Sequence, residues 1–163
     1  MQDAIICDID GTVALMKGKR SPFEYHKADK DEPNIVVINT VLAMKELHQC
    51  KLIMLSAREN VLLNTPSTDN KHNRTYVNEK YNDLEQLTSD WLNTHLGQGN
   101  WDNLIMRPAG EYRKDCYVKY DIYNNHIKDN YNVLMVFDDR NQVVDMWRNG
   151  LGLQCFQVAD GNF

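Results

Sequence analysis

The stretch Ala4-Ile5-Ile6-Cys7-Asp8-Ile9-Asp10-Gly11-Thr12 joins a short apolar run to an acidic turn. An uninterrupted apolar run of this kind is typical of a strand that is buried on both faces of a sheet. Asp8 and Asp10 stand two positions apart, so a regular strand points their side chains to opposite faces. Gly11 permits a turn that brings the second carboxylate back toward the first. We therefore expect an acidic turn at the carboxyl end of a buried strand.

The rest of the chain alternates short apolar runs with longer segments of helical periodicity. Further strands are expected over Leu52–Leu55, Leu104–Met106, Val133–Phe137 and Leu153–Val158, and helices over Ile35–Cys50, Val77–Leu96, Arg113–Lys128 and Gln142–Arg148. Strands that alternate with helices predict an α/β fold with a five-stranded, mostly parallel sheet and helices on both faces. Such sheets bind ligands beyond the carboxyl ends of the strands, where the strand order switches.

Polar residues stand at these expected strand ends. The second strand is followed by Ser56-Ala57-Arg58 and the fourth by Asp138-Asp139-Arg140, and Lys119 lies on the helix before the fourth strand. Crowded carboxylates repel one another unless a cation compensates, and ligands that are all oxygen suit Mg²⁺. No cluster of His and Cys offers a zinc site. The sequence therefore predicts a magnesium site where the acidic strand ends meet.

Length, composition and charge limit the classes of protein that fit. The chain has 163 residues, of which 42% are hydrophobic and 25% charged, as expected for one globular domain. No apolar run is long enough to span a bilayer and no signal peptide is visible, so we expect a cytoplasmic protein without membrane contact. The net charge of −5 argues against a protein that coats duplex nucleic acid, but not against one that grips a nucleic-acid end. The widely spaced Cys7, Cys50, Cys116 and Cys155 predict buried, reduced thiols.

Four segments resemble, in order, the four motifs of the haloacid dehalogenase superfamily of phosphohydrolases: Asp8 to Thr12, Ser56, Lys119 and Asp138-Asp139. The resemblance implies a Rossmann-like core with a minimal cap, and catalysis through an aspartyl-phosphate. Asp8 is then the nucleophile, and Asp10 protonates the leaving oxygen and later activates water. Ser56 and Lys119 hold the phosphoryl oxygens during the transfer.

The same resemblance implies Mg²⁺ as the cofactor. Its expected ligands are Asp8, the backbone carbonyl of Asp10, and one carboxylate of the acidic pair. We expect Asp139 to bind the metal directly and Asp138 to orient the site, although the sequence alone does not order the two.

Residues outside the four motifs are similar to the phosphatase domain of phage polynucleotide kinase/3′-phosphatases. The similar segments are Arg20-Ser21-Pro22-Phe23, Ser56-Ala57-Arg58-Glu59, Arg113-Lys114-Asp115 and the tail from Asp138 to Phe163. This resemblance implies removal of a 3′-phosphate from DNA or RNA ends or from nucleoside 3′-phosphates. It adds Arg20, Arg58, Asp115 and Thr12 as substrate-binding residues. Asp115 lies one turn before Lys119 on the same helix face, a spacing that allows the two side chains to pair.

The sequence departs from the phage family in three ways, one of which is that Lys19-Arg20 stands where the family has one basic residue, so the position carried over to Arg20 is open by one residue. No G-x-x-x-x-G-K-[ST] phosphate loop is present, so we expect one phosphatase domain over residues 1–163 and no kinase domain. This sequence is compatible with a kinase or ligase supplied by another chain, and with a homo-oligomer. If a phage encodes the protein, the expected location is the cytoplasm of the host cell. Val61–Tyr76 is longer than its counterpart, and its polar composition favours a mobile surface loop over a nucleic-acid contact.

Basic residues near the expected strand ends predict a positive mouth that suits a polymer end. They are Lys17, Lys19, Arg20, Arg58, Arg113, Lys114 and Arg140. The segment between Thr12 and Ile35 is too short for a lid domain, so the site is expected to stay open.

Two other readings stay open. One is a 5′(3′)-nucleotidase of the same superfamily that acts on free mononucleotides. The other is a binding module for phosphorylated ends without catalysis, which has no need of the nucleophile Asp8. Preference for 5′-nucleotides indicates the first, and stoichiometric binding without turnover indicates the second.

Overall fold

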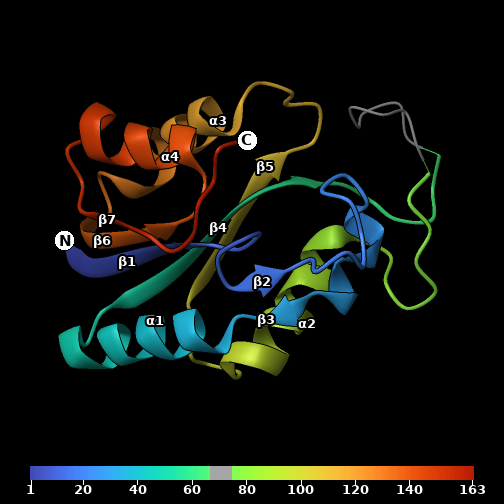
Figure 1. Ribbon diagram of the computed structural model, residues 1–163, viewed down its shortest axis with the longest axis horizontal. Coiled ribbons are helices and arrows are strands. Elements are labelled where there is room, and N and C mark those ends of the chain that lie inside the picture. The colour runs from blue at the N-terminus through green and yellow to red at the C-terminus, as the bar shows by residue number, and fades with distance from the viewer. Residues whose placement is uncertain (67–74) are drawn as a thin grey trace.

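The computed structural model describes residues 1–66 and 75–163. Its main sheet contains β1 (Gln2–Asp8), β4 (Lys51–Asn60), β5 (Asn103–Pro108), β6 (Tyr131–Asp138) and β7 (Cys155–Gln157). The strand order is β5-β4-β1-β6-β7, and every neighbouring pair is parallel (Figure 1). The predicted α/β fold with a five-stranded parallel sheet is therefore confirmed.

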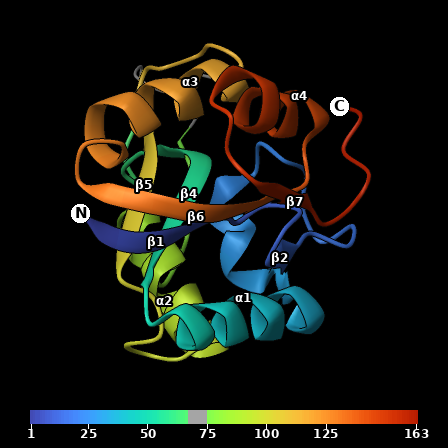
Figure 2. The ribbon, with the colours of Figure 1, turned by 90° about the vertical axis from the view of Figure 1, so that its left-hand side faces the viewer.

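Helices cover both faces of the sheet, as the alternation of strands and helices requires. One face carries α1 (Ile35–His48) and α2 (Leu84–Leu96), and the other carries α3 (Asp115–Ile122) and α4 (Asn141–Asp145) (Figure 2). Within residues 1–66 and 75–163, no helix has the length and apolar character needed to cross a membrane.

The central strand β1 shows why its sequence is apolar throughout. Ile5 and Cys7 pack into the core beneath α1 and α2, while Ala4 and Ile6 pack into the core beneath α3 and α4. All four are at most 1% exposed, because alternate side chains of a strand point to opposite faces and both faces are covered here. The four cysteines are free thiols, and Cys7, Cys50 and Cys155 are buried as expected, whereas Cys116 is only half-buried.

Three predicted helices have bounds that differ from the expected ones. The helix expected over Val77–Leu96 begins only at Leu84, because Asn78 Oδ1 accepts hydrogen bonds from the backbone N–H groups of Lys80 (2.8 Å) and Tyr81 (3.1 Å). These local bonds compete with helix formation. Asp83 then caps α2 by accepting a bond from the N–H of Gln86 at 2.7 Å. The helix expected over Arg113–Lys128 consists of α3 followed by a π-helical turn over Tyr123–Ile127. The helix expected over Gln142–Arg148 likewise consists of α4 followed by a π-helical turn over Met146–Gly150.

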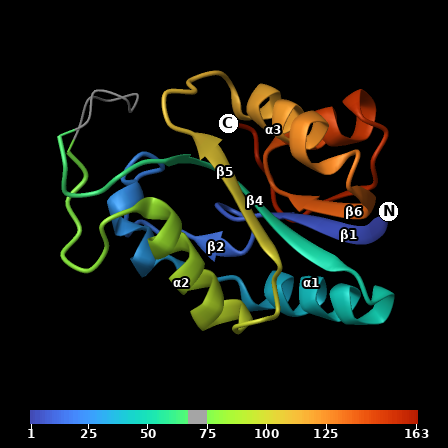
Figure 3. The same cartoon turned by 180° about the vertical axis from the view of Figure 1, so that it is seen from behind.

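The connection from β1 to α1 holds small elements that the sequence did not predict. A two-stranded antiparallel ribbon joins β2 (Ala14–Leu15) to β3 (Glu32–Pro33), and a 3₁₀ helix, η1 (Tyr25–Lys30), lies between them. The 3₁₀ helix lies beside α2 in the views from the front and from behind (Figure 3), where Ala28 packs in one cluster with α2 side chains. This short insertion is the minimal cap expected from the sequence.

The expectation for Val61–Tyr76 is only partly open to comparison, since residues 67–74 lie outside the described part of the chain. The described ends of the segment expose most of their residues, but three apolar side chains are buried. Val61, Leu63 and Tyr76 are at most 4% exposed and pack against Leu84. The N–H of Asn64 also donates to the carbonyl of Tyr76 at 2.7 Å. The ends are fixed because their apolar side chains complete a third core cluster beside α2.

Candidate active site

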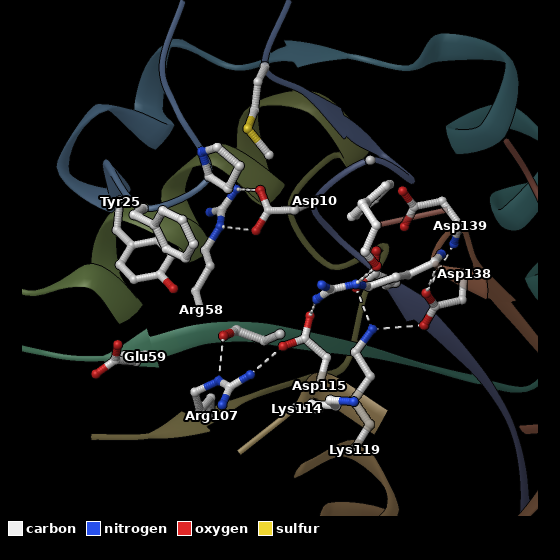
Figure 4. Close-up of a pocket in the computed structure, with 18 of the residues that line it drawn as sticks. Asp10, Tyr25, Arg58, Glu59, Arg107, Lys114, Asp115, Lys119, Asp138 and Asp139 are labelled. Atoms are coloured by element: carbon white, nitrogen blue, oxygen red, sulfur yellow. Dashed lines mark hydrogen bonds and ion pairs between the residues drawn. The ribbon is translucent and has the colours of Figure 1, made fainter. Parts of the chain in front are cut away.

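The predicted site residues Asp8, Ser56 and Asp138 lie on three neighbouring strands, because β1 lies between β4 and β6. Asp8 ends β1, Ser56 lies in β4, and Asp138 ends β6. A pocket of about 480 Å³ opens above these ends, and both Asp8 and Asp138 line it (Figure 4). The pocket therefore occupies the switch point of the sheet, where α/β folds bind their ligands.

Gly11 makes the turn after β1. The carbonyl of Ile9 accepts hydrogen bonds from three successive N–H groups, those of Thr12, Val13 and Ala14. Gly11 has φ +82°, and a Cβ atom on it would lie only 2.1 Å from Oδ2 of Asp139. A side chain is excluded by both the backbone angle and this approach, so glycine lets the turn press against the acidic pair.

A buried lysine lies among three carboxylates at the floor of the pocket. Lys119 Nζ donates to Oδ1 of Asp8 at 2.6 Å and to Oδ2 of Asp138 at 2.7 Å. One oxygen each from Asp8, Asp138 and Asp139 lie within 4.8 Å of one another. Lys119 is 2% exposed and the three aspartates are at most 5% exposed, so these charges interact in a poorly solvated place.

The charges of this cluster do not balance. Three carboxylates face one ammonium, which leaves two negative charges if all are ionised. Burial raises the pKa of Asp8, and burial together with the charge of Asp138 raises the pKa of Asp139 to about 6. Burial alone would lower the pKa of Lys119, but Asp138 and Asp8 outweigh it and raise that pKa. An all-oxygen cluster that lacks two positive charges fits a hard divalent cation such as Mg²⁺.

The two aspartates of the acidic pair differ in their contacts. Asp138 Oδ1 accepts from the backbone N–H groups of Asp139 (3.0 Å) and Arg140 (3.3 Å), and its Oδ2 accepts from Lys119 and from Trp147 Nε1 (3.3 Å). Four donors, two of them backbone N–H groups, therefore engage the carboxylate of Asp138, whereas only two of the described side chains, Lys119 and Thr12, engage that of Asp8. The Asp139 carboxylate lies against Gly11 and lines the pocket. This arrangement favours Asp139 as the direct ligand and Asp138 as the orienting residue.

An arginine clamp holds the carboxylate of Asp10. β4 pairs with β5 as far as Ser56 and again from Glu59, so Ala57 and Arg58 form a bulge that re-aims the arginine. Arg58 Nε and Nη2 each donate to Asp10 at 2.8 Å, and Arg20 Nη2 donates to it at 2.6 Å. The sequence indicated these arginines as substrate ligands, and the structure shows both of them bound to Asp10.

Asp31 binds both arginines of the clamp. It accepts from Arg20 Nε at 2.8 Å and Nη2 at 2.7 Å, and from Arg58 Nη2 at 3.2 Å. Two arginines and two aspartates balance in charge. Burial raises the pKa of Asp10, but Arg58 and Arg20 outweigh that effect and lower it to about 2. The clamp therefore keeps Asp10 ionised in the ligand-free protein.

Thr12 and Ser56 lie beneath the pocket. Thr12 Oγ1 donates to Oδ2 of Asp8 at 2.8 Å, so it fixes the second oxygen of that carboxylate. Ser56 is 1% exposed, and its Oγ accepts from the N–H of Arg58 at 3.1 Å. The pocket wall includes Arg58. It does not include Thr12, Ser56 or Arg20.

Asp115 does not pair with Lys119, although the helical spacing allows that pairing. The Lys119 ammonium is held by the two buried carboxylates, and Asp115 instead bridges the guanidinium groups of Arg107 and Arg140. All three of these residues line the pocket. Two positive charges against one negative leave a net charge of +1 on this group of three residues.

The predicted positive mouth is smaller than expected. Arg58, Lys114 and Arg140 line the pocket as predicted. Lys17 and Lys19, however, both pair with Glu32 at 2.9 Å, and Arg113 pairs with Glu111 and Asp121. None of these three basic residues lines the pocket, because local carboxylates hold them elsewhere.

Sequence reasoning missed three residues that support the site. Arg107 lies near the end of β5, and the rule applied to the other strand ends would have found it. Asp31 carries no signal in the sequence, because only the folded chain brings it to Arg20. Trp147 lies in the tail that resembles the phage domain, but nothing in the sequence indicates its bond to Asp138.

Comparisons with known proteins agree with this geometry. The family model of the polynucleotide kinase PNKP phosphatase domain matches residues 2–163. A putative bifunctional polynucleotide kinase/RNA ligase of Autographa californica nuclear polyhedrosis virus is 33% identical over 147 residues, which are 90% of this chain and 18% of that protein.

Two solved structures have the same fold. A chain of a Pnkp1/Rnl/Hen1 complex is 37% identical with a TM-score of 0.79, and the match covers 100% of this chain and 48% of that one. A chain of a Pnkp1/Rnl/Hen1 RNA repair complex is 36% identical with a TM-score of 0.79, covering 99% and 44%. This chain thus spans less than half the length of these relatives. A family model that spans nearly the whole chain, together with a shared fold at this identity, leads to one assignment: the chain belongs to the family of PNKP phosphatase domains, which are phosphatases of the haloacid dehalogenase type.

Proposed function

We propose that the chain removes 3′-phosphates from DNA or RNA ends or from nucleoside 3′-phosphates, through an aspartyl-phosphate on Asp8. The observation that carries the proposal is the pairing of Asp8 with Lys119 at the floor of an accessible pocket. Family membership supports phosphate ester hydrolysis, and the second aspartate two positions on can supply the proton that the leaving 3′-oxygen requires.

In the first step, an oxygen of the Asp8 carboxylate attacks phosphorus and the bond from phosphorus to the 3′-oxygen breaks. Lys119 and Thr12 orient that carboxylate through its two oxygens. Asp10 donates a proton to the leaving 3′-oxygen, so the nucleic acid departs with a 3′-hydroxyl. For this, Asp10 has to leave the clamp of Arg20 and Arg58 and take up a proton, which substrate binding has to drive.

In the second step, Asp10 accepts a proton from water, and the water oxygen attacks phosphorus. The bond from phosphorus to Asp8 breaks, which releases inorganic phosphate and restores the carboxylate. Asp8, Asp139 and the backbone carbonyl of Asp10 would hold Mg²⁺, with Asp138 orienting the site. When bound, the cation offsets the repulsion between carboxylate and phosphate.

The size of the cap supports a polymer end as substrate. Only the β2–β3 ribbon and η1 stand between β1 and α1, so this connection, which the structure describes in full, holds no separate domain that could enclose a small ligand. The surplus positive charge of Arg107 and Arg140 over Asp115 suits a phosphodiester next to the reacting group.

The relatives suggest which other activities accompany the reaction. Those proteins are named for a polynucleotide kinase, an RNA ligase and an RNA repair complex. We propose that a ligase outside the 163 residues of this chain uses the 3′-hydroxyl made here, and that a kinase outside them supplies the 5′-phosphate to which it is joined.

A phosphate-release assay tests the proposal. The substrates are one oligonucleotide phosphorylated at either its 3′ or its 5′ end, and free 3′- and 5′-mononucleotides, each with Mg²⁺ or with chelator. We expect the highest kcat/KM on the 3′-phosphorylated oligonucleotide, and only with Mg²⁺. Preference for free 5′-nucleotides would instead identify a nucleotidase, and stoichiometric binding without turnover would identify a binding module.

A further inference from the structure

One arginine of the pocket wall keeps hydrogen-bond donors that the fold does not use. Arg107 is fully engaged, since its Nε and Nη1 donate to backbone carbonyls at 2.7–3.0 Å and its Nη2 pairs with Asp115. Arg140 engages its Nε with Phe163 and its Nη1 with Asp115, but its Nη2 makes no hydrogen bond to the described part of the chain. The side chain of Arg140 is 27% exposed and lines the pocket. Of the two arginines, Arg140 therefore has donors left for a ligand.

The orientation of the Arg140 guanidinium depends on Phe163. Arg140 Nε donates to the backbone oxygen of Phe163 at 2.7 Å, and the guanidinium carbon lies 5.1 Å from the centre of the Phe163 ring. The first contact fixes one edge of the guanidinium, and the second holds it over the ring by a cation–π attraction. Phe163 is 68% exposed, so packing into the core does not explain where its ring lies.

The segment that carries Phe163 is fixed beside the acidic pair. The N–H groups of Asn141 and Phe163 both donate to the carbonyl of Gly161 at 2.9 Å. Gly161 is buried, and a Cβ atom on it would lie only 2.0 Å from the backbone oxygen of Asp139. Glycine therefore lets this segment approach the end of β6 closely enough for Phe163 to reach Arg140.

A phosphodiester of the substrate is the ligand that fits the unused donors of Arg140. Arg140 directly follows Asp138 and Asp139, which lie close to Asp8. In a polynucleotide, a 3′-phosphate beside Asp8 is joined through one sugar to the nearest phosphodiester, whereas a nucleoside 3′-phosphate has no phosphodiester. Arginine binds phosphate oxygens strongly because its donors are charged and fixed in one plane.

We propose that Phe163 is a positioning residue, which holds the Arg140 guanidinium so that its Nη2 binds the phosphodiester next to the reacting phosphate. The inference rests on the proposed function and adds a residue that makes the enzyme favour a polynucleotide end over a single nucleotide. Phe163 acts through Arg140 and not on the phosphoryl group, so it should affect the binding of the substrate and leave the chemical steps alone.

The test measures KM and kcat on a 3′-phosphorylated oligonucleotide and on a nucleoside 3′-phosphate, both with Mg²⁺. For Phe163→Ala we expect KM on the oligonucleotide to rise roughly tenfold at low salt, the order of one charged hydrogen bond, with kcat little changed. The slope of log KM against log salt should become shallower by about 0.7, the share of one phosphate contact on a single strand. On the nucleoside 3′-phosphate, which has no phosphodiester, KM should match that of wild type.

A double-variant cycle shows whether Phe163 acts through Arg140. Residues that act through one contact are not additive, so adding Phe163→Ala to Arg140→Gln should raise KM no further than Arg140→Gln does alone. Phe163→Tyr keeps a ring over the guanidinium and should retain the wild-type KM. If the two losses instead multiply, Phe163 contacts the substrate independently and the positioning role is wrong.

Phe156→Ala is the matched control. Phe156 is 53% exposed on β7 and does not line the pocket, so its removal should change KM on neither substrate. An equal loss on both substrates in Phe163→Ala, or no loss on the oligonucleotide, would overturn the inference. Activity on the nucleoside 3′-phosphate also shows that each variant is folded. If the wild-type enzyme releases no phosphate from either substrate, the proposed function itself fails, which is a different result.

Discussion

Lys119 Nζ lies 2.6 Å from Oδ1 of Asp8, although the two residues are 111 positions apart in the chain. The same ammonium reaches Asp138, so one side chain ties α3 to the ends of β1 and β6. Lys119 is thus both a structural link and the cation nearest to the proposed nucleophile. Its removal should affect stability and catalysis together.

Lys119→Met keeps the length of the side chain and removes its charge. Breaking a buried ion pair on one side leaves uncompensated charge, so we expect the free energy of unfolding at pH 7 to fall by about 3–5 kcal/mol. At pH 5 the loss should be smaller, because the carboxylates can take up protons. Urea unfolding at the two pH values measures both. Phosphate release from every substrate should fall steeply.

Lys51→Met is the matched control for that substitution. Lys51 also pairs with an aspartate, Asp102 at 2.8 Å, but its side chain is 41% exposed. Exposed pairs contribute only about 0–1 kcal/mol, so this variant should unfold almost as wild type does. Equal destabilisation by both variants would show that Lys119 has no special place in the core.

Asp139→Asn tests the unbalanced charge of the acidic cluster. The pKa of Asp139 is raised from 3.8 to about 6, so its protonated form is the one that the fold prefers. That contribution is fully present below pH 4 and is lost as the pH rises through 6. Without metal, the variant should therefore be more stable than wild type at pH 7, by on the order of 2–3 kcal/mol. At pH 4 the two should unfold alike.

Mg²⁺ should reverse that ranking at pH 7, because asparagine is a poorer ligand for a hard cation than a carboxylate. Thermal unfolding with chelator and with saturating Mg²⁺ shows whether it does. Asp129→Asn, at an exposed position, is the control for the loss of one negative charge. If the melting temperature of the wild-type protein is the same with chelator and with Mg²⁺, the result would contradict a metal site at Asp8, Asp138 and Asp139.

The loss of activity caused by Asp10→Asn should depend on the leaving group of the substrate. A 3′-alkoxide is a poor leaving group and needs the proton, whereas p-nitrophenolate leaves without it. General acid catalysis is worth about 10²–10⁴-fold, so the first step should slow far more on a 3′-phosphorylated oligonucleotide than on p-nitrophenyl phosphate. A pre-steady-state burst of p-nitrophenol from the variant would reveal this. Equal slowing in single-turnover assays would remove Asp10 as the general acid.

Arg140→Gln should weaken the salt dependence of the reaction. The variant leaves Arg107 and Asp115 balanced in charge at the pocket mouth. Each phosphate contact to a single strand contributes ~0.7 to the slope of log affinity against log salt, and the slope should fall by about one such contact. KM measured between low and high salt gives the slope. Arg113→Gln, which lies outside the pocket wall, should leave it unchanged.

Much of the fold was predictable because buried parallel strands have a distinct sequence pattern. All five strands of the main sheet were expected, and the runs before Asp8 and Asp138 placed the acidic strand ends correctly. The ends of α2 were less predictable, because Asn78 and Asp83 each accept local bonds whose geometry depends on the fold. The β2–β3 ribbon was missed since strands this short have no periodicity to detect.

The site was predictable where a residue follows a strand and unpredictable where it depends on tertiary contacts. Asp115 illustrates the difference. Helical spacing placed it one turn from Lys119, but two buried carboxylates hold that lysine and two arginines hold Asp115. Asp31 was invisible for the same reason, because its partners Arg20 and Arg58 lie on different segments.

The central claim is that Asp8 is the nucleophile of a 3′-phosphatase, and Asp8→Asn tests it most directly. The substitution preserves shape and removes one crowded charge, so the variant should melt at or above the wild-type temperature in the absence of metal. Phosphate release from a 3′-phosphorylated oligonucleotide with Mg²⁺ is the measurement. We expect the folded variant to release no phosphate above the blank while wild type turns over many times. Phosphate release at a near-wild-type rate would contradict the claim.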